Sequence, residues 1–224
     1  MTSTEKRPHV VGIGGTLRDS STGLRALEEA LAAAEEAGAT TELLNLRDLG
    51  LPMYEPGKPL EEFGESTERL VEAMRGADAM LWSTAAYHGT LAGVTKNALD
   101  FVQFMAQDEN PYLEDKVVGF IATAGGDMAA VNAINAMVHV VHALRGVAAP
   151  LSVPVTQSWR VFDDEGNVND EGVARRLESL GRERDPGCLG QRGGAFDGEP
   201  HGGVARYQRC CSRGTRSTAS ATGA

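Results

Sequence analysis

The sequence predicts an α/β domain in which helices cover both faces of a parallel sheet. Along residues 8–183, short apolar runs alternate with segments whose apolar residues recur every three or four positions. This alternation is typical of buried strands that are each followed by an amphipathic helix. Two strand-to-helix junctions, at residues 12–22 and 84–90, are rich in glycine and hydroxyl residues. Such junctions mark the edge at which open parallel sheets bind nucleotides.

The first half of the chain supplies two strands and two helices. Residues 9–13 form a short apolar run that ends at two glycines, which predicts a strand followed by a loop. Leucines spaced for one helical face predict a helix over residues 22–36. A second strand is expected over residues 40–46 and a second helix over residues 60–74. Between them, residues 50–59 hold three prolines and two glycines and must form a loop.

The second half continues the same alternation. Strands are predicted over residues 77–83, 116–123 and 148–155, and helices over residues 91–105, 128–144 and 171–180. Right-handed crossovers between parallel strands put helices on both faces, which gives a doubly wound sheet. Ligand-type loops after strands one, three and four fit the strand order 2-1-3-4-5, whose switch point lies between strands one and three.

Charge and composition exclude several classes of partner. The formal net charge is −10, which disfavours nucleic acid and anionic membranes because both attract clustered lysine and arginine. No apolar run approaches the roughly 20 residues that span a bilayer, and residues 1–8 lack an apolar signal core. We therefore expect a cytoplasmic protein without a nucleic-acid or membrane partner.

The composition changes at Pro186. All three cysteines, five arginines and many glycines and serines lie beyond it, and helical periodicity ends. We expect a domain over residues 1–185 and a disordered, low-complexity tail over residues 186–224, because such a segment cannot bury enough apolar surface to order itself. An alternative is that the tail is an out-of-frame product that replaces the end of the last helix.

The first loop has the chemistry of a phosphate site. Two glycines allow a sharp turn, and the first amides of the following helix point partial positive charge at one place. Arg18 can add a charged contact. The loop matches neither GxGxxG nor GxxxxGK[ST]. Four residues supply hydroxyl groups: Thr16, Ser20, Ser21 and Thr22. The alternative is that these hydroxyls only cap the helix and that Arg18 is solvated.

The second and third loops can approach a planar ligand. Tyr87, followed by His88 and Gly89, can offer an aromatic face together with backbone amides and carbonyls. Gly125 and Gly126 follow another strand and let the backbone come close to a ligand. Each loop also has an alternative interpretation without a ligand. The second can be an ordinary solvent-facing loop, and the third can be only a tight strand-to-helix turn.

Three further polar features have structural explanations. His139 and His142 are three residues apart on one predicted helix but have no evident partner ligand, so we predict no metal site. Asp127 is expected to cap the helix that follows it. Lys96 and Asp100 are four residues apart and are expected to form an ion pair.

The motifs resemble those of the NADPH-dependent FMN reductase family, a branch of the flavodoxin-like superfamily. Gly15-Thr16-Leu17-Arg18-Asp19-Ser20-Ser21 is similar to its G-S-x-R-x-x-S motif, with threonine in place of the first serine. Residues 84–90, TAAYHGT, and 93–100, GVTKNALD, are similar to T-P-x-Y-[NH]-G-[ST] and G-x-x-K-N-A-[IL]-D. Ala85 stands where the family usually has proline.

The resemblance implies a flavodoxin-like three-layer α/β/α fold with bound FMN. It implies that the five polar residues of the first loop, Thr16, Arg18, Ser20, Ser21 and Thr22, hold the FMN phosphate. The second and third loops would line the isoalloxazine ring through Thr84, Ala85, Ala86, Tyr87, His88, Gly89, Gly125 and Gly126. It also implies a homodimer or a dimer of dimers, with the flavin near the interface and the helix over residues 92–104 contributing to that interface.

The implied activity is hydride transfer from NADPH or NADH through FMN to a flavin, a quinone or another small acceptor. The cofactor carries this chemistry, so no catalytic residue is predicted. Two alternatives stay open: a flavodoxin-type electron carrier that does not oxidise NAD(P)H, and a regulatory module that has lost its flavin function.

Overall fold

The computed structural model describes residues 7–163 and 165–182, and its core is a sheet of parallel strands. The strands are β1 (His9–Gly14), β2 (Thr40–Asn45), β3 (Ala79–Tyr87), β4 (Thr90–Leu91), β5 (Val117–Thr123) and β6 (Val147–Val155). The long strands stand in the order β2-β1-β3-β5-β6, which is the predicted order, while β4 pairs antiparallel with β3. The predicted count of five strands was therefore wrong by this short one.

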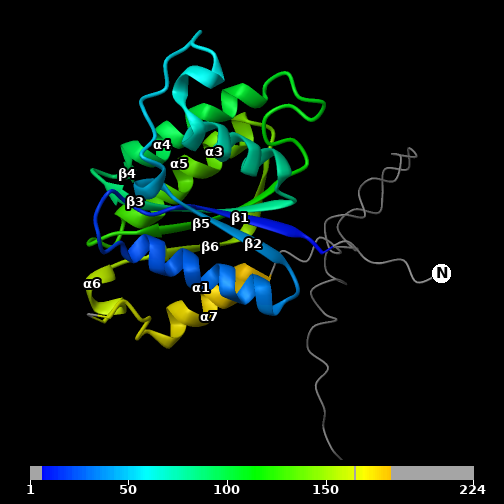
Figure 1. Ribbon diagram of the computed structural model, residues 1–224. Helices are drawn as coiled ribbons and strands as arrows, with labels where there is room; N and C mark the ends of the chain where they lie inside the picture. Colours follow the sequence, from blue (N-terminus) through cyan, green and yellow to red (C-terminus); the bar gives the residue numbers. More distant parts are fainter. Residues whose placement is uncertain (1–6, 164, 183–224) are drawn as a thin grey trace, which may run out of the picture. The chain divides into compact units, whose positions relative to one another are not determined.

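Helices cover the two faces of the sheet, as Figure 1 shows. One face carries α1 (Thr22–Glu36) and α7 (Glu171–Arg182), which pack together over one apolar cluster. The other carries α3 (Glu65–Gly76), α4 (Gly93–Asp100) and α5 (Ala129–Ala143) over a second cluster. This is the three-layer, flavodoxin-like arrangement that the sequence predicts.

The predicted helices over residues 60–74 and 91–105 are each divided. A 3-10 turn, η1 (Leu60–Phe63), precedes α3, and the chain turns between them at Gly64, whose φ is 88°. The second segment begins as β4 and ends as another 3-10 turn, η2 (Phe101–Met105). Helical spacing of apolar residues does not reveal such breaks, because a 3-10 turn also buries residues three apart.

Two short helices follow strands at the same edge of the sheet. They are α2 (Leu46–Leu49) after β2 and α6 (Ser158–Val161) after β6, and neither was predicted. Within the described residues no helix has the length and apolar character that crossing a bilayer requires. The predicted tail from Pro186 and the end of the predicted domain, residues 183–185, lie outside the described residues.

Candidate functional site

The three predicted ligand loops leave the sheet at neighbouring strands. β1, β3 and β5 are adjacent and parallel, so the loops at residues 15–21, 84–92 and 124–128 emerge at one edge (Figure 1). Chain direction across the sheet reverses between β1 and β3, because β1 leads to β2 on one side and the chain later returns on the other. Ligands of open α/β sheets bind at such a switch point.

The first loop is shaped by its own glycine and hydroxyl groups. Gly15 has a φ of 93°, and a Cβ atom there would lie 2.9 Å from Asn45 Oδ1, so only glycine fits. The buried Thr16 hydroxyl accepts a 3.3 Å hydrogen bond from the backbone amide of Arg18. Ser21 is the N-cap of α1, and its Oγ accepts from Leu24 N at 3.3 Å.

The start of α1 is suited to an anion. Its first turn holds no acidic residue, and the carboxylate of Asp19 in the preceding loop pairs with Arg47, which leaves the partial positive charge of the helix N-terminus for a ligand. Arg18 and Ser20 are exposed, and Thr22 is half-buried at the first helical position. The predicted set thus divides in two: Thr16 and Ser21 hold the loop in shape, while Arg18, Ser20 and Thr22 stay accessible to a phosphate.

A buried serine that the sequence reasoning missed fixes α1 against the sheet. Ser83 Oγ on β3 donates a 2.7 Å hydrogen bond to Gly23 O on α1. A Cβ atom at Gly23 would lie 3.1 Å from Ser83 Oγ and 3.4 Å from Thr123 Oγ1 on β5. The helix N-terminus therefore lies directly against the middle of β3 and the end of β5. The available signal was the hydroxyl of Ser83, next to that of Thr84, at the end of an apolar run.

The second loop is a tight hairpin. Tyr87 pairs with Thr90 and Ala86 with Leu91, which leaves His88 and Gly89 as a two-residue turn. Both have positive φ, 52° and 83°, as a type I′ turn requires. The hairpin keeps Tyr87, His88 and Gly89 exposed, with 49% of the Tyr87 surface accessible.

Thr84 and its neighbours form the base of this hairpin. Thr84 is fully buried, and its Oγ1 accepts from Ala92 N at 3.1 Å and lies 2.9 Å from Thr95 Oγ1 on α4. Ala85 is buried and Ala86 is half-buried. The Thr84 side chain therefore joins the hairpin to α4, and the exposed part of the loop begins beyond Ala85.

The third loop leaves room beside its backbone. Gly125 and Gly126 are exposed, and a Cβ atom at either would meet nothing within 4 Å in the described chain. The prediction that Asp127 caps α5 was wrong. Met128 is the N-cap residue, and Asp127 Oδ1 instead accepts a 2.9 Å hydrogen bond from Gln157 Nε2. The helix begins one residue later than the prediction assumed.

A fourth loop, after β2, is bound to α4 through an amide that was not singled out. Asn97 is buried, its Oδ1 accepts from Tyr54 N at 2.9 Å, and its Nδ2 donates to Pro52 O at 2.8 Å. The predicted loop over residues 50–59 is thereby held at the same sheet edge as the other three. The expected ion pair between Lys96 and Asp100 is also present on α4.

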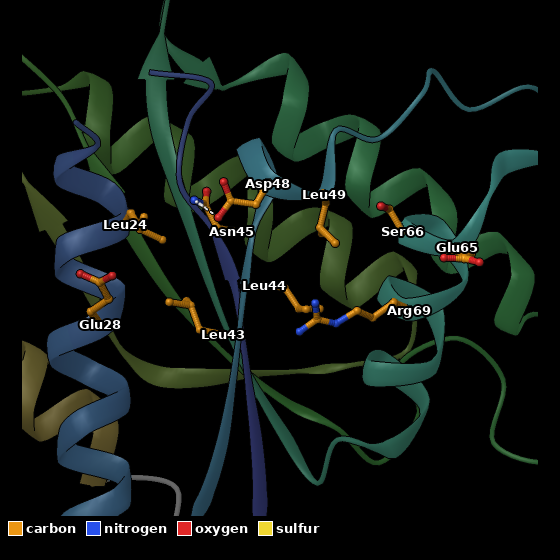
Figure 2. A pocket seen from close by; sticks show the side chains of 10 residues that line it. All are labelled: Leu24, Glu28, Leu43, Leu44, Asn45, Asp48, Leu49, Glu65, Ser66 and Arg69. Atoms are coloured by element: carbon orange, nitrogen blue, oxygen red, sulfur yellow. Dashed lines mark hydrogen bonds between the residues drawn. The ribbon is translucent and has the colours of Figure 1, made fainter. Parts of the chain in front are cut away.

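A groove of about 480 Å³ lies beside β2, between α1 and α3 (Figure 2). It is lined by Leu24, Glu28, Leu43, Leu44, Asn45, Asp48, Leu49, Glu65, Ser66 and Arg69. None of the predicted flavin contacts is among these residues. The three carboxylates outnumber Arg69, which also pairs with Glu42 at 3.1 Å. The groove therefore disfavours an anionic cofactor, and the candidate site remains the open edge formed by the loops.

Comparison with known proteins shows the family to which the chain is similar. The sequence profile of the NADPH-dependent FMN reductase family matches residues 8–160. An NAD(P)H-dependent FMN reductase of Pseudomonas aeruginosa is 30% identical over 180 residues, which cover 76% of this chain and 92% of the relative. An NAD(P)H-dependent FAD/FMN reductase of Geobacillus thermodenitrificans is 26% identical over 173 residues, covering 76% and 88%.

A solved structure supports the fold. The apo form of an NADH:FMN oxidoreductase superposes with a TM-score of 0.61 at 20% identity, covering 78% of this chain and 86% of the other. At this identity the likeness concerns the arrangement of helices and strands alone. The first loop, the hairpin and the third loop all fall within the stretch that the family profile matches.

Proposed function

The chain belongs to the NADPH-dependent FMN reductase family, and on this premise we propose that it binds FMN across the carboxyl edge of β1, β3 and β5. Membership makes the chain an FMN-dependent NAD(P)H oxidoreductase. The main support for this placement is the N-terminus of α1. Its first turn has no acidic residue, and a hydrogen bond from Ser83 Oγ to Gly23 O joins it to β3. An anion bound there lies beside the hairpin and the third loop.

The residues of the first loop fit the phosphate of FMN. Arg18, Ser20 and Thr22 are the accessible donors, and the amides of the first helical turn add to them. Thr16 and Ser21 are used inside the loop, and their role is to shape it. The phosphate would therefore be held by one guanidinium, two hydroxyls and backbone amides.

The hairpin and the third loop fit the flavin ring. The exposed segment over residues 87–89 offers Tyr87 and the backbone of a tight turn to one side of a planar ring. Gly125 and Gly126 offer backbone without side chains to its pyrimidine side. We assign Ala85 a place under the ring, and Thr84 a supporting role through its contacts with α4.

The chemistry that FMN supplies when bound is acceptance of hydride from NADH or NADPH and delivery of electrons to a small acceptor. The chain's own residues bind the two ends of the cofactor, orient the ring and cover one of its faces. Flavins, quinones and azo compounds are the acceptor classes that we propose to test.

We also propose that the protein is a cytoplasmic homodimer, with α4 near the interface. Apolar side chains at the site edge support the dimer, since Tyr87 and Met128 are 49% and 68% exposed in the single chain. Light scattering on a sizing column tests it, and a monomer mass would contradict it.

The function is tested by colour. Purified protein mixed with FMN should retain a yellow chromophore after gel filtration, and anaerobic addition of NADPH or NADH should bleach it within seconds. A flavodoxin-type electron carrier would stay yellow under the same conditions. Failure to retain FMN in calorimetry as well as on the column would overturn the placement of the cofactor.

A further inference from the structure

The two tryptophans of the chain have opposite environments. Trp82 is buried in the sheet with 1% of its surface accessible, while Trp159 on α6 is 65% exposed. An indole ring exposes a large apolar area, and such rings at binding edges commonly take a planar ligand group. Trp159 is therefore the side chain whose exposure most needs an explanation.

A cation lies against the same ring. The guanidinium carbon of Arg160 is 4.5 Å from the centroid of the Trp159 ring. No salt bridge to a carboxylate is formed by Arg160 within residues 7–163 and 165–182. Of the other cations that follow the carboxyl ends of the strands, Arg18 is assigned to the FMN phosphate, Arg47 contacts Asp19, and Lys58 lies 3.9 Å from Glu55. Arg160 thus has charge available for an anion on a protein whose net charge is −10.

Hydrogen bonds place this pair beside the third loop. Ser158 N donates to Ala124 O at 3.0 Å, one residue before Gly125. Gln157 Nε2 donates to Asp127 Oδ1 at 2.9 Å, and Gln157 has a φ of 46°, which a non-glycine residue rarely adopts. The start of α6 is therefore fixed at two points to the loop that we assign to the pyrimidine side of the flavin.

The hydride donor, a reduced nicotinamide dinucleotide, has two halves that bind at different places. Its nicotinamide ring must lie on the flavin to transfer hydride, so its other half, an adenosine carrying phosphate groups, must extend over a neighbouring rim. An indole stacks on adenine, and a guanidinium binds phosphate in a charge-assisted contact. We propose that Trp159 and Arg160 bind the adenosine-phosphate half of the reduced nicotinamide dinucleotide. This proposal rests on the proposed function.

Steady-state kinetics of the FMN-loaded protein provide the first test. Trp159→Ala and Arg160→Ala should each raise KM for NADPH about tenfold, the size expected for losing one stacking or charged contact, with a smaller change in kcat. Trp159→Phe should restore part of the loss because it keeps an aromatic face. Arg176→Ala, which removes an exposed cation from α7, is the matched control and should leave KM unchanged.

A comparison of the two dinucleotides identifies the phosphate. If Arg160 contacts the pyrophosphate, Arg160→Ala raises KM for NADH and NADPH by the same factor. If it contacts the 2′-phosphate, KM rises for NADPH alone. Either result supports the proposal, and an unchanged KM for both overturns it.

Fluorescence gives a reading that does not depend on turnover. Titration of the FMN-loaded protein with NADP⁺ should quench the emission of Trp159, and the quenching should disappear in Trp159→Phe. Arg160→Ala should shift the midpoint to about tenfold higher NADP⁺. Equal quenching in the wild type and in Trp159→Phe would overturn the proposal.

Two controls separate this proposal from others. If the wild type binds FMN but NADPH never bleaches it, the proposed function fails; if bleaching occurs and both variants keep the wild-type KM, only the present proposal fails. Because an exposed indole can also contact a second copy of the chain, light scattering is measured for each variant. A KM change that appears only with a change of oligomeric mass would overturn the direct contact.

Discussion

The hydroxyl of Ser83 donates a 2.7 Å hydrogen bond to the carbonyl oxygen of Gly23, which joins the middle of β3 to the first turn of α1. Both residues are buried, so the bond is shielded from water. The phosphate loop connects β1 to this first turn of α1. The position of the proposed anion site therefore depends on a hydrogen bond whose two residues are not themselves proposed to contact the ligand.

Ser83→Ala should lower the free energy of unfolding by about 1–2 kcal/mol, since it removes one buried hydrogen bond and leaves a small void. It should also weaken FMN binding, because α1 is no longer fixed against β3. Urea unfolding and FMN calorimetry measure the two effects. Ser179→Ala, an exposed serine on α7, is the control and should change neither.

Gly14→Ala should destabilise the sheet. A Cβ atom at Gly14 would lie 2.7 Å from both Cβ and the carbonyl oxygen of Ser83, so β1 and β3 must separate. Overpacking of this kind costs about 1–3 kcal/mol, measurable as a lower denaturant midpoint. Gly76→Ala is the matched control, because a Cβ atom there would meet nothing within 4 Å. A Gly14→Ala protein as stable as the control would contradict the close approach of the strands.

Arg18→Ala should weaken FMN binding by about 1.5–3 kcal/mol, the usual value of a hydrogen bond to a charged group. Stability should not change, because Arg18 is exposed. Calorimetric titration of the apo-protein measures the affinity, and riboflavin, which lacks the phosphate, provides the comparison. The assignment fails if the affinities of the wild type and the variant for FMN are equal, or if riboflavin loses as much as FMN.

Asn97→Ala should release the loop after β2. The amide of Asn97 forms hydrogen bonds to the backbone of Tyr54 and Pro52, so its loss leaves one donor and one acceptor unpaired at an expected cost of about 1–3 kcal/mol. Hydrogen exchange at Tyr54 and proteolysis over residues 50–59 should both accelerate. Asn135→Ala on the exposed side of α5 is the control. Unchanged exchange at Tyr54 would show that the loop is held by other contacts.

Lowering the pH should weaken the turn that Asp163 and Asn167 form before α7. Hydrogen bonds from the side chain and the backbone amide of Asn167 lower the pKa of the Asp163 carboxyl below its ordinary value. A group whose pKa is lower in the folded state adds stability above its unfolded value and loses it as pH falls through the folded one. Carboxyl NMR titration should therefore give Asp163 a midpoint below that of an unperturbed aspartate, and Asn167→Ala should raise it. An unchanged midpoint in that variant would refute the cause.

Much of the fold could be predicted from the sequence because buried strands and amphipathic helices leave strong periodic patterns. The order of the five long strands followed from the position of the ligand loops at β1, β3 and β5. The hairpin containing β4 was missed because the sequence around His88 and Gly89 was interpreted as a ligand loop. The same residues serve as a type I′ turn, and sequence alone does not show that two residues on either side pair.

The loops of the candidate site could be predicted from the sequence, but the residues that hold those loops in place could not. Motif residues such as Arg18 and Tyr87 are visible because their types fit a ligand. Ser83, Asn97 and Gln157 act through hydrogen bonds to backbone atoms far along the chain, which local patterns do not reveal. Asp127 was misassigned for the same reason, since its partner Gln157 lies 30 residues away.

The lack of carboxylates in the opening turn of α1 affects how the protein is handled. Sulfate and inorganic phosphate carry the same charge and similar oxygen geometry as the terminus of FMN, and so compete for the same amides. Purification in such buffers should strip pigment and yield pale preparations. Preparations in a neutral zwitterionic buffer should keep their flavin, so that their absorbance gives the fraction of protein that holds FMN.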